Sequence, residues 1–274
     1  MRVIVTGGSG RAGRYTVKEL ADAGHEVINV DRMRPSTALP GGFIQIDLTD
    51  AGEVYDVFAQ VRPEGVCHLA ANPSPSGYSR QGTFQNNVMS TYNMMQAAGD
   101  FGVGRFIYAS SEMATGWLTT EDLPPRFPFN EADRVESPNA YALSKYMGEV
   151  IATSLITRYP GMSICSLRIN NVIPPDEYHR LEARRRNFPS EGSSNFWSYI
   201  DARDVAGAFR PWKAKAAATK SSSSPPPTPA SMSPFKRRWK PATAPAPTSP
   251  RPRTTPVGVR LQQDQRVFWL GSEV

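Results

Sequence analysis

The chain has 274 residues, with 31 Lys and Arg against 25 Asp and Glu and only two cysteines. This length suffices for one α/β domain with a buried core and a small appendage. The positive excess lies in residues 211–274, which hold eleven basic and two acidic side chains, so residues 1–210 do not have the charge of a nucleic-acid-binding domain. No apolar run reaches the roughly 18 residues that a membrane span needs.

The cysteines and the first residues predict a protein of the reducing cytoplasm. Cys67 and Cys165 each lie inside an apolar run, so both are expected to be buried thiols and neither a disulfide nor a metal site is predicted. Met1 leads directly into an apolar segment, which leaves no room for a signal peptide.

The first predicted element is a strand that breaks into a glycine-rich loop. Residues 2–5 are short, β-branched and poor in charge, as in a strand buried on both faces of a parallel sheet. The loop that follows, TGGSGRAG, places Gly7, Gly10 and Gly13 at a spacing of three. This spacing suits a tight turn, close approach of backbone N–H groups to a pyrophosphate, and close packing of a helix on the strand. A helix beginning near Arg11 would direct its positive dipole end at the phosphates.

A second strand, Glu26 to Asp31, ends on a carboxylate eighteen residues after the last loop glycine. An acid at this place accepts both hydroxyls of an adenosine ribose and repels a 2′-phosphate, which favours NAD over NADP. Arg32 and Arg34 follow directly and can instead hold that phosphate, so NADP stays an open alternative.

Three further strands and three helical patterns complete the predicted sheet. A strand at 43–47 ends on Asp47 and Leu48, where an adenine ring can be held, and a strand at 65–71 ends on small residues that let the chain pass beneath a dinucleotide. His68 in that strand is expected to be a core histidine. Helices are predicted at 15–24, 50–61 and 83–101, and a fifth strand at 105–109. This alternation predicts a Rossmann-type, doubly wound parallel α/β sheet, with the loop at 72–82 placed where such sheets bind ligands.

A tyrosine and a lysine four residues apart carry the predicted chemistry. Tyr141 and Lys145 share one face of a predicted helix. A phenol with a free pKa near ~10 is a poor base at neutral pH, and an ammonium group one turn away is expected to lower that pKa. Ser111, at the end of the fifth strand, can donate a hydrogen bond to the substrate oxygen that Tyr141 protonates or deprotonates.

With these motifs the chain resembles the extended short-chain dehydrogenase/reductase superfamily, within its NAD-dependent epimerase/dehydratase family, over residues 1 to about 210. The resemblance implies a catalytic Ser111, Tyr141 and Lys145, with Lys145 also holding the nicotinamide ribose, and it places Asn171 near the substrate. The cofactor-binding positions that it implies are Gly7, Gly10, Arg11, Ala12, Gly13, Asp31, Arg32, Asp47, Leu48, Leu69, Ala70, Ala71, Asn87, Tyr141 and Lys145.

The implied substrate is a small sugar, sugar acid or nucleotide-sugar. Sugar-nucleotide epimerases of the family follow the serine pair with VYG, where this chain reads MATG at 113–116, which weakens the assignment to nucleotide-sugar epimerization and leaves sugar-acid or polyol oxidation as the nearest competing chemistry. A non-catalytic dinucleotide-binding protein is the alternative from another class. The resemblance also implies a homodimer built from the helices beginning near Thr83 and Ala140. From the charge, the apolar runs and the two cysteines described above, no nucleic acid, membrane or metal is expected as a partner.

Residues 211–274 depart from the family, which supplies a seventh strand and the rest of the substrate lobe here. Twelve prolines and fourteen Ser or Thr with no sustained hydrophobic period predict a largely disordered tail beyond an incomplete substrate segment at about 168–200. The tail is either natural or the product of a frameshift, since codons for 220–230 can be chosen so that an offset frame reads VFLIAAADT. Only Val267 to Leu270 is apolar enough to dock, against the sheet edge that a missing seventh strand leaves open.

Overall fold

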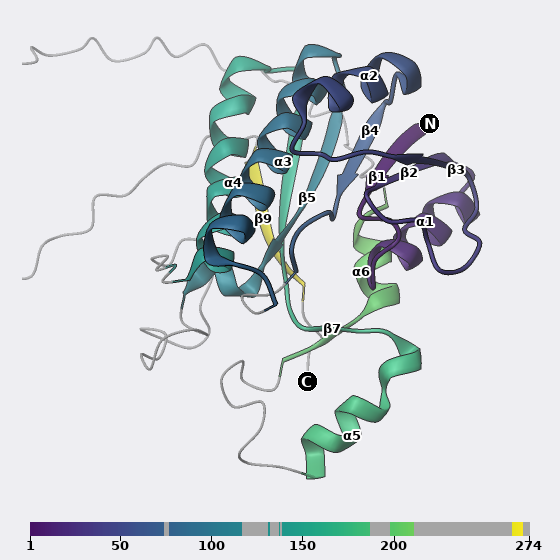
Figure 1. Ribbon diagram of the computed structural model, residues 1–274, viewed down its shortest axis with the longest axis vertical. Helices are drawn as coiled ribbons and strands as arrows, with labels where there is room; N and C mark the ends of the chain where they lie inside the picture. The colour runs from purple at the N-terminus through teal and green to yellow at the C-terminus, as the bar shows by residue number, and fades with distance from the viewer. Residues whose placement is uncertain are drawn as a thin grey trace, which may run out of the picture. The chain divides into compact units, whose positions relative to one another are not determined.

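A computed structural model describes residues 1–73, 77–116, 131, 137, 139–186 and 198–210, together with the backbone of 265–270 (Figure 1). These residues belong to one compact unit. Within the described part of the chain, no helix is long and apolar enough to cross a membrane.

The unit is built on a parallel sheet of seven strands in the order β3-β2-β1-β4-β5-β6-β9. The central strands are buried on both faces, and the three core residues of β1, Val3, Ile4 and Val5, are at most 1% exposed. The order of strands reverses at β1, which is the topological switch point of a doubly wound sheet. The strands span Arg2–Thr6 (β1), Glu26–Asp31 (β2), Gly42–Gln45 (β3), Gly65–His68 (β4), Arg105–Ser111 (β5), Ser163–Ile169 (β6) and Gln265–Leu270 (β9).

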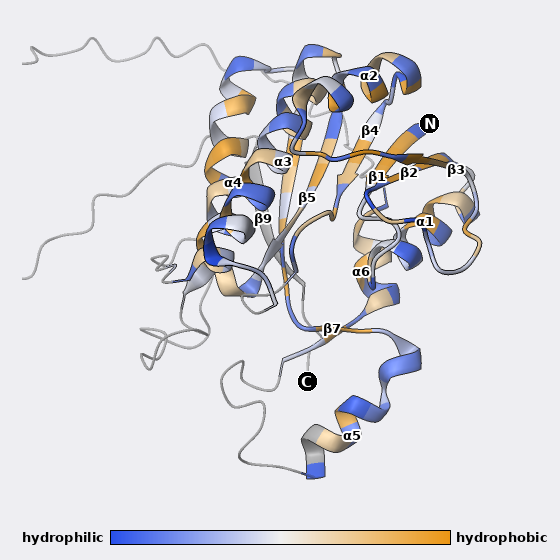
Figure 2. Cartoon of the chain, viewed as in Figure 1, coloured by the Kyte–Doolittle hydropathy of each residue, from blue (hydrophilic) through white to orange (hydrophobic). Residues whose placement is uncertain are grey.

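Helices cover both faces of the sheet (Figure 1). One core cluster joins the sheet to α2 (Ala51–Val61), α3 (Arg80–Asp100) and α4 (Ala140–Arg158). A second cluster joins the opposite face to α1 (Gly13–Asp22) and α6 (Ala202–Ala208). The apolar colouring of the central strands and of the inward helix faces follows these two clusters (Figure 2). The predicted α/β fold with a doubly wound parallel sheet is confirmed.

Side-chain caps set where several helices begin. Asp50 accepts a hydrogen bond from the backbone N–H of Glu53 and caps α2, which begins at Ala51, one residue after the predicted start. Asn139 caps α4 in the same way. Ser79 caps α3 and moves its start to Arg80, three residues before the predicted Thr83, because the polar first turn of this helix shows no apolar period.

The described residues between β6 and α6 form a small structure of their own. Strand β7 (Val172–Ile173) pairs in parallel with β8 (Ile200–Asp201). Between them lie the 3-10 turn η3 (Pro175–Glu177) and the helix α5 (His179–Arg186), in which blue, hydrophilic parts of the ribbon alternate with orange and tan ones (Figure 2).

The predicted edge strand is present in the last part of the chain. β9 pairs in parallel with β6 from Ile164↔Gln265 to Ile169↔Leu270. The expectation that Val267 to Leu270 docks at the open sheet edge is therefore confirmed. The other residues of the tail, 211–264 and 271–274, lie outside the described residues.

Candidate active site

The glycine-rich loop after β1 is fixed by close backbone contacts. Gly7 has a φ of +68°, and a Cβ placed there would lie 2.7 Å from the backbone nitrogen of Ala70. A Cβ at Gly13 would lie only 2.0 Å from the carbonyl oxygen of Gly7. Glycine is therefore required at both positions, and the first turn of α1 begins against the loop. The unpaired N–H groups of such a turn attract anions.

Asp31, at the end of β2, ties this loop to the neighbouring strand. One carboxylate oxygen accepts a hydrogen bond from the backbone N–H of Ser9 at 3.1 Å, and the other accepts one from the N–H of Met33 at 3.1 Å. Arg32 donates a hydrogen bond to the side-chain oxygen of Asn72 at 3.1 Å. The guanidinium of Arg34 lies over the ring of Phe43.

Asp47 and Leu48 follow β3, the strand that pairs with β2. The side chain of Asp47 accepts hydrogen bonds from the backbone and the hydroxyl of Thr49, at 2.9 and 2.8 Å. These two bonds hold the pKa of Asp47 below its usual value, and the bond from the backbone N–H of Thr49 has the larger effect. The carboxylate is thus ionised and already oriented at neutral pH.

A cavity of about 990 Å³ runs along the carboxyl ends of the strands. It is lined by nearly all of the predicted site residues, namely Gly7, Gly10, Arg11, Ala12, Gly13, Asp31, Arg32, Asp47, Leu48, Leu69, Ala70, Ala71, Ser111, Tyr141, Lys145 and Asn171. The predicted phosphate loop and the predicted catalytic residues therefore open into the same space.

Asn87 is the predicted site residue that does not line this cavity. Its side chain is 1% exposed, accepts a hydrogen bond from the backbone of Asn72 at 2.7 Å, and donates to the hydroxyl of Ser144 at 3.0 Å. The structure therefore places Asn87 behind the wall, where it joins the end of β4 to α4. Asn86 and Ser90, on the same helix, line the cavity instead.

Ser111, Tyr141 and Lys145 meet at the end of β5. Ser111 ends the strand and caps the short turn η1 (Glu112–Thr115) by accepting a hydrogen bond from the N–H of Met113. The ammonium nitrogen of Lys145 donates to the carbonyl of Ala109 at 2.7 Å and lies 5.9 Å from the centre of the Tyr141 ring. Burial lowers the pKa of Lys145 to about 8.

The pKa of Tyr141 differs from the expected direction. Burial raises it above its ordinary value, a hydrogen bond with Ser111 opposes this, and the negative charge of Glu112 raises it further. The expected lowering by Lys145 does not appear in the structure, because the ammonium group is directed at a backbone carbonyl and faces the ring of Tyr141. The phenol is therefore protonated in the free protein.

A buried ion pair lies directly behind these residues. Glu149, two helical turns after Tyr141, accepts two hydrogen bonds from Arg168 of β6, at 3.0 and 2.8 Å. It also accepts one from Ser110, the neighbour of Ser111, at 2.6 Å. This cluster joins α4, β5 and β6 where each carries a site residue.

His68 is a core histidine, as predicted. Its ring is fully buried between the hydroxyls of Thr6 and Thr91, at 2.7 and 3.1 Å. Burial, together with the charge of Lys145, lowers its pKa to about 3, so the ring is neutral. Both cysteines are buried and free, also as predicted.

Two charged cavity residues escaped prediction from sequence. Glu112 directly follows the serine pair, is 8% exposed, and accepts a hydrogen bond from Ser198 at 3.0 Å. Its position directly after Ser111 in the sequence could have indicated that it lines the same cavity. Arg180 of α5 also lines the cavity, and its sequence context, a polar stretch after two prolines, carries no such signal.

Known proteins resemble this chain in both sequence and fold. A model of the "NAD dependent epimerase/dehydratase family" matches residues 3–211. The NAD-dependent glucose-6-phosphate dehydrogenase of Haloferax volcanii is 30% identical over 66% of this chain and 73% of its own length. The UDP-glucose 4-epimerase of Bacillus subtilis is 29% identical over 62% of this chain and 52% of its own length.

Solved structures give the same result. The Thermus thermophilus UDP-glucose 4-epimerase complex with NAD superposes with a TM-score of 0.62, at 25% identity over 76% of this chain and 73% of that one. The matching part of this chain spans only about half to three-fifths of several epimerase relatives. The match over residues 3–211 nonetheless shows that the chain belongs to the NAD-dependent epimerase/dehydratase family.

Proposed function

We propose that this protein is an NAD-dependent oxidoreductase or epimerase that acts on a C–OH/C=O group of a sugar, sugar acid or nucleotide-sugar. The observation that supports this most strongly is that Ser111, Tyr141 and Lys145 line the same cavity as the phosphate loop. A bound nicotinamide would accept or return the hydride. The chain itself supplies proton transfer, orientation and exclusion of water.

Tyr141 is the proposed acid/base. Its phenol is protonated in the free protein, so it is ready to give a proton to a carbonyl oxygen, and in the reverse direction its phenolate takes the proton of a hydroxyl. Lys145 lines the same cavity, and its proposed role is to hold a ribose hydroxyl of the cofactor with its ammonium group. Ser111 lines the cavity beside Tyr141 and is proposed to donate a hydrogen bond to the same substrate oxygen.

Asp31 supports NAD as the cofactor. Its carboxylate is anchored by the N–H groups of Ser9 and Met33 and lines the cavity, where a 2′-phosphate would meet its negative charge. Arg32 donates a hydrogen bond to Asn72, and the guanidinium of Arg34 lies over Phe43. Each arginine would therefore have to leave its present partner to bind a 2′-phosphate. We expect NADH to bind at least tenfold more tightly than NADPH, as measured by fluorescence titration.

The competing function is that of a non-catalytic dinucleotide-binding protein. It is favoured because the chain matches only about half of the length of these epimerase relatives, 52% and 55%. NADH titration followed by assays with sugars, sugar acids, sugar phosphates and nucleotide-sugars separates the two. Binding with turnover of one substrate class supports the enzyme, binding without any turnover supports the competing function, and no binding contradicts both.

The proposed location of the protein is the reducing cytoplasm, which suits its two free buried thiols.

A homodimer through α3 and α4 is the proposed assembly. The two helices pack on each other and present four half-exposed apolar side chains, Met89 and Tyr92 on α3 and Leu143 and Val150 on α4. Sedimentation at micromolar concentration is expected to give the dimer mass, and the Tyr92→Glu and Leu143→Glu double variant is expected to give the monomer. A monomeric unmodified protein would contradict this assembly.

A further inference from the structure

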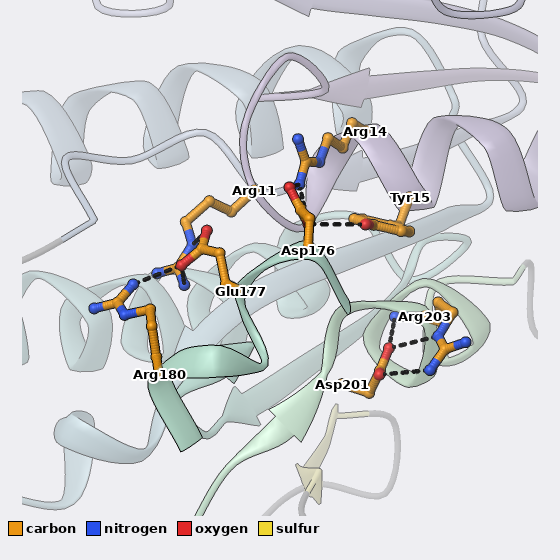
Figure 3. A network of polar contacts seen from close by, with 8 residues as sticks. All are labelled: Arg11, Arg14, Tyr15, Asp176, Glu177, Arg180, Asp201 and Arg203. Atoms are coloured by element: carbon orange, nitrogen blue, oxygen red, sulfur yellow. Dashed lines mark hydrogen bonds and ion pairs between the residues drawn. The ribbon is translucent and has the colours of Figure 1, made fainter. Parts of the chain in front are cut away.

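The turn η3 is fastened to the phosphate loop and to the first turn of α1 by four charged side chains, Asp176, Glu177, Arg11 and Arg14 (Figure 3). Asp176 accepts two hydrogen bonds from the guanidinium of Arg14, each 2.8 Å, and one from the hydroxyl of Tyr15. Glu177 accepts two from Arg11, at 3.0 and 2.6 Å. These contacts join residues more than 160 positions apart in the sequence, so they hold η3 against the phosphate loop.

Glu177 also binds a second guanidinium. Arg180 donates to the same oxygen, Oε2, that accepts the shorter bond from Arg11, and both distances are 2.6 Å. Two guanidinium groups thus converge on one carboxylate oxygen (Figure 3). Two like charges this close repel each other unless an anion lies between them. The carboxylate provides that anion in the structure.

The two arginines face the cavity at its phosphate-loop end. Arg11 and Arg180 both line it, together with the loop glycines. Their side chains are 46% and 54% exposed, so both guanidiniums can reach a ligand. Guanidinium forks match phosphate as well as carboxylate, and a phosphate carries more acceptor oxygens and more negative charge.

We propose that Arg11 and Arg180 form a two-guanidinium site for a phosphate or pyrophosphate group, and that the Glu177 carboxylate occupies this site when no such anion is bound. The site makes α5 part of the ligand-binding surface. The anion is either the pyrophosphate of the dinucleotide or a phosphate of the substrate. This assignment of the ligand rests on the proposed function, but the site itself does not.

Inorganic pyrophosphate tests the site directly by calorimetry. The Arg180→Ala variant is expected to lose about fivefold or more in affinity at low salt, and the loss is expected to shrink in high salt. Arg186→Ala is the matched control, because it removes the same charge from the same helix while Arg186 pairs with Glu182 and does not line the cavity. Glu177→Gln is expected to tighten binding about twofold or more, because it removes the competing charge.

The source of the anion follows from two further titrations of the same variants. A loss in Arg180→Ala for NADH assigns the site to the cofactor, and a loss for UDP or glucose 6-phosphate but not NADH assigns it to the substrate. Equal affinities of Arg180→Ala and Arg186→Ala for pyrophosphate, NADH, UDP and glucose 6-phosphate would overturn the site. Failure of the unmodified protein to bind NADH would instead contradict the proposed function, and the pyrophosphate titration would still decide the site.

Discussion

Burial gives the ammonium group of Lys145, a proposed site residue, a cost in stability. Its side chain is 4% exposed, and burial lowers its pKa to about 8, against about 10.4 in an unfolded chain. Between these values the unfolded state holds more protons, so the free energy of unfolding gains from this group as pH rises from 8 to 10.4. At pH 7 the buried charge costs about 3 kcal/mol.

We therefore expect Lys145→Met to raise the free energy of unfolding at pH 7. The gain should be about 2 kcal/mol, because the lost hydrogen bond to the carbonyl of Ala109 offsets about 1 kcal/mol. Near pH 10.5 the gain should be gone and the variant should be slightly the less stable of the two proteins, because the cost of burying the charge then falls below that of the lost hydrogen bond. Urea unfolding of both proteins at the two pH values measures this. A variant that is less stable at pH 7 would show that Lys145 is not strained by burial.

At the scale of elements, a buried ion pair between Glu149 of α4 and Arg168 of β6 lies close to the proposed site residues. Glu149 and Arg168 are 5% and 3% exposed, so a change that leaves one charge without the other is costly. Arg168→Met is expected to lower the free energy of unfolding by about 3 kcal/mol or more. Ser110→Ala removes one hydrogen bond to the same carboxylate and is expected to cost about 1 kcal/mol.

The double variant Glu149→Gln with Arg168→Met provides the control. It removes both charges, so it should recover part of the stability that Arg168→Met loses, as urea unfolding would show. If the double variant is as unstable as the sum of the single variants, the two side chains do not act as a pair.

Local patterns of sequence were sufficient for most of the elements. The apolar runs of β1, β2 and β5 and the glycine spacing of the loop at 7–13 predicted a Rossmann sheet and the phosphate end of the cavity. Strand β5 runs two residues further than its apolar run, because Ser110 and Ser111 continue the pairing with β6.

Long-range features were not available from the sequence. The pairing of Arg11 with Glu177 depends on a turn 166 positions away, and nothing local in either segment indicates it. The pKa of Tyr141 depends on how deeply the helix buries the phenol and on the charge of Glu112. The spacing of four residues between Tyr141 and Lys145 determines neither the burial of the phenol nor its proximity to Glu112.

At the scale of the whole molecule, β9 links the end of the chain to the sheet. Composition alone predicts that protease trims the chain to a core ending near Arg210. Because β9 pairs with β6 along six residues, we now expect a peptide containing Gln265–Leu270 to stay bound to that core after cleavage. Size-exclusion chromatography followed by mass spectrometry of the core peak tests this, and a core that elutes without the peptide would contradict the pairing.

The central claim is that Tyr141 transfers the proton in an NAD-dependent reaction. Its most direct test compares Tyr141→Phe with the unmodified protein on the substrate found by the assays above. We predict at least a hundredfold lower kcat for the variant, because proton transfer by a positioned side chain contributes about 10²–10⁴ to rate, with NADH affinity changed less than threefold. Normal turnover by Tyr141→Phe, at unchanged NADH affinity, would contradict the account.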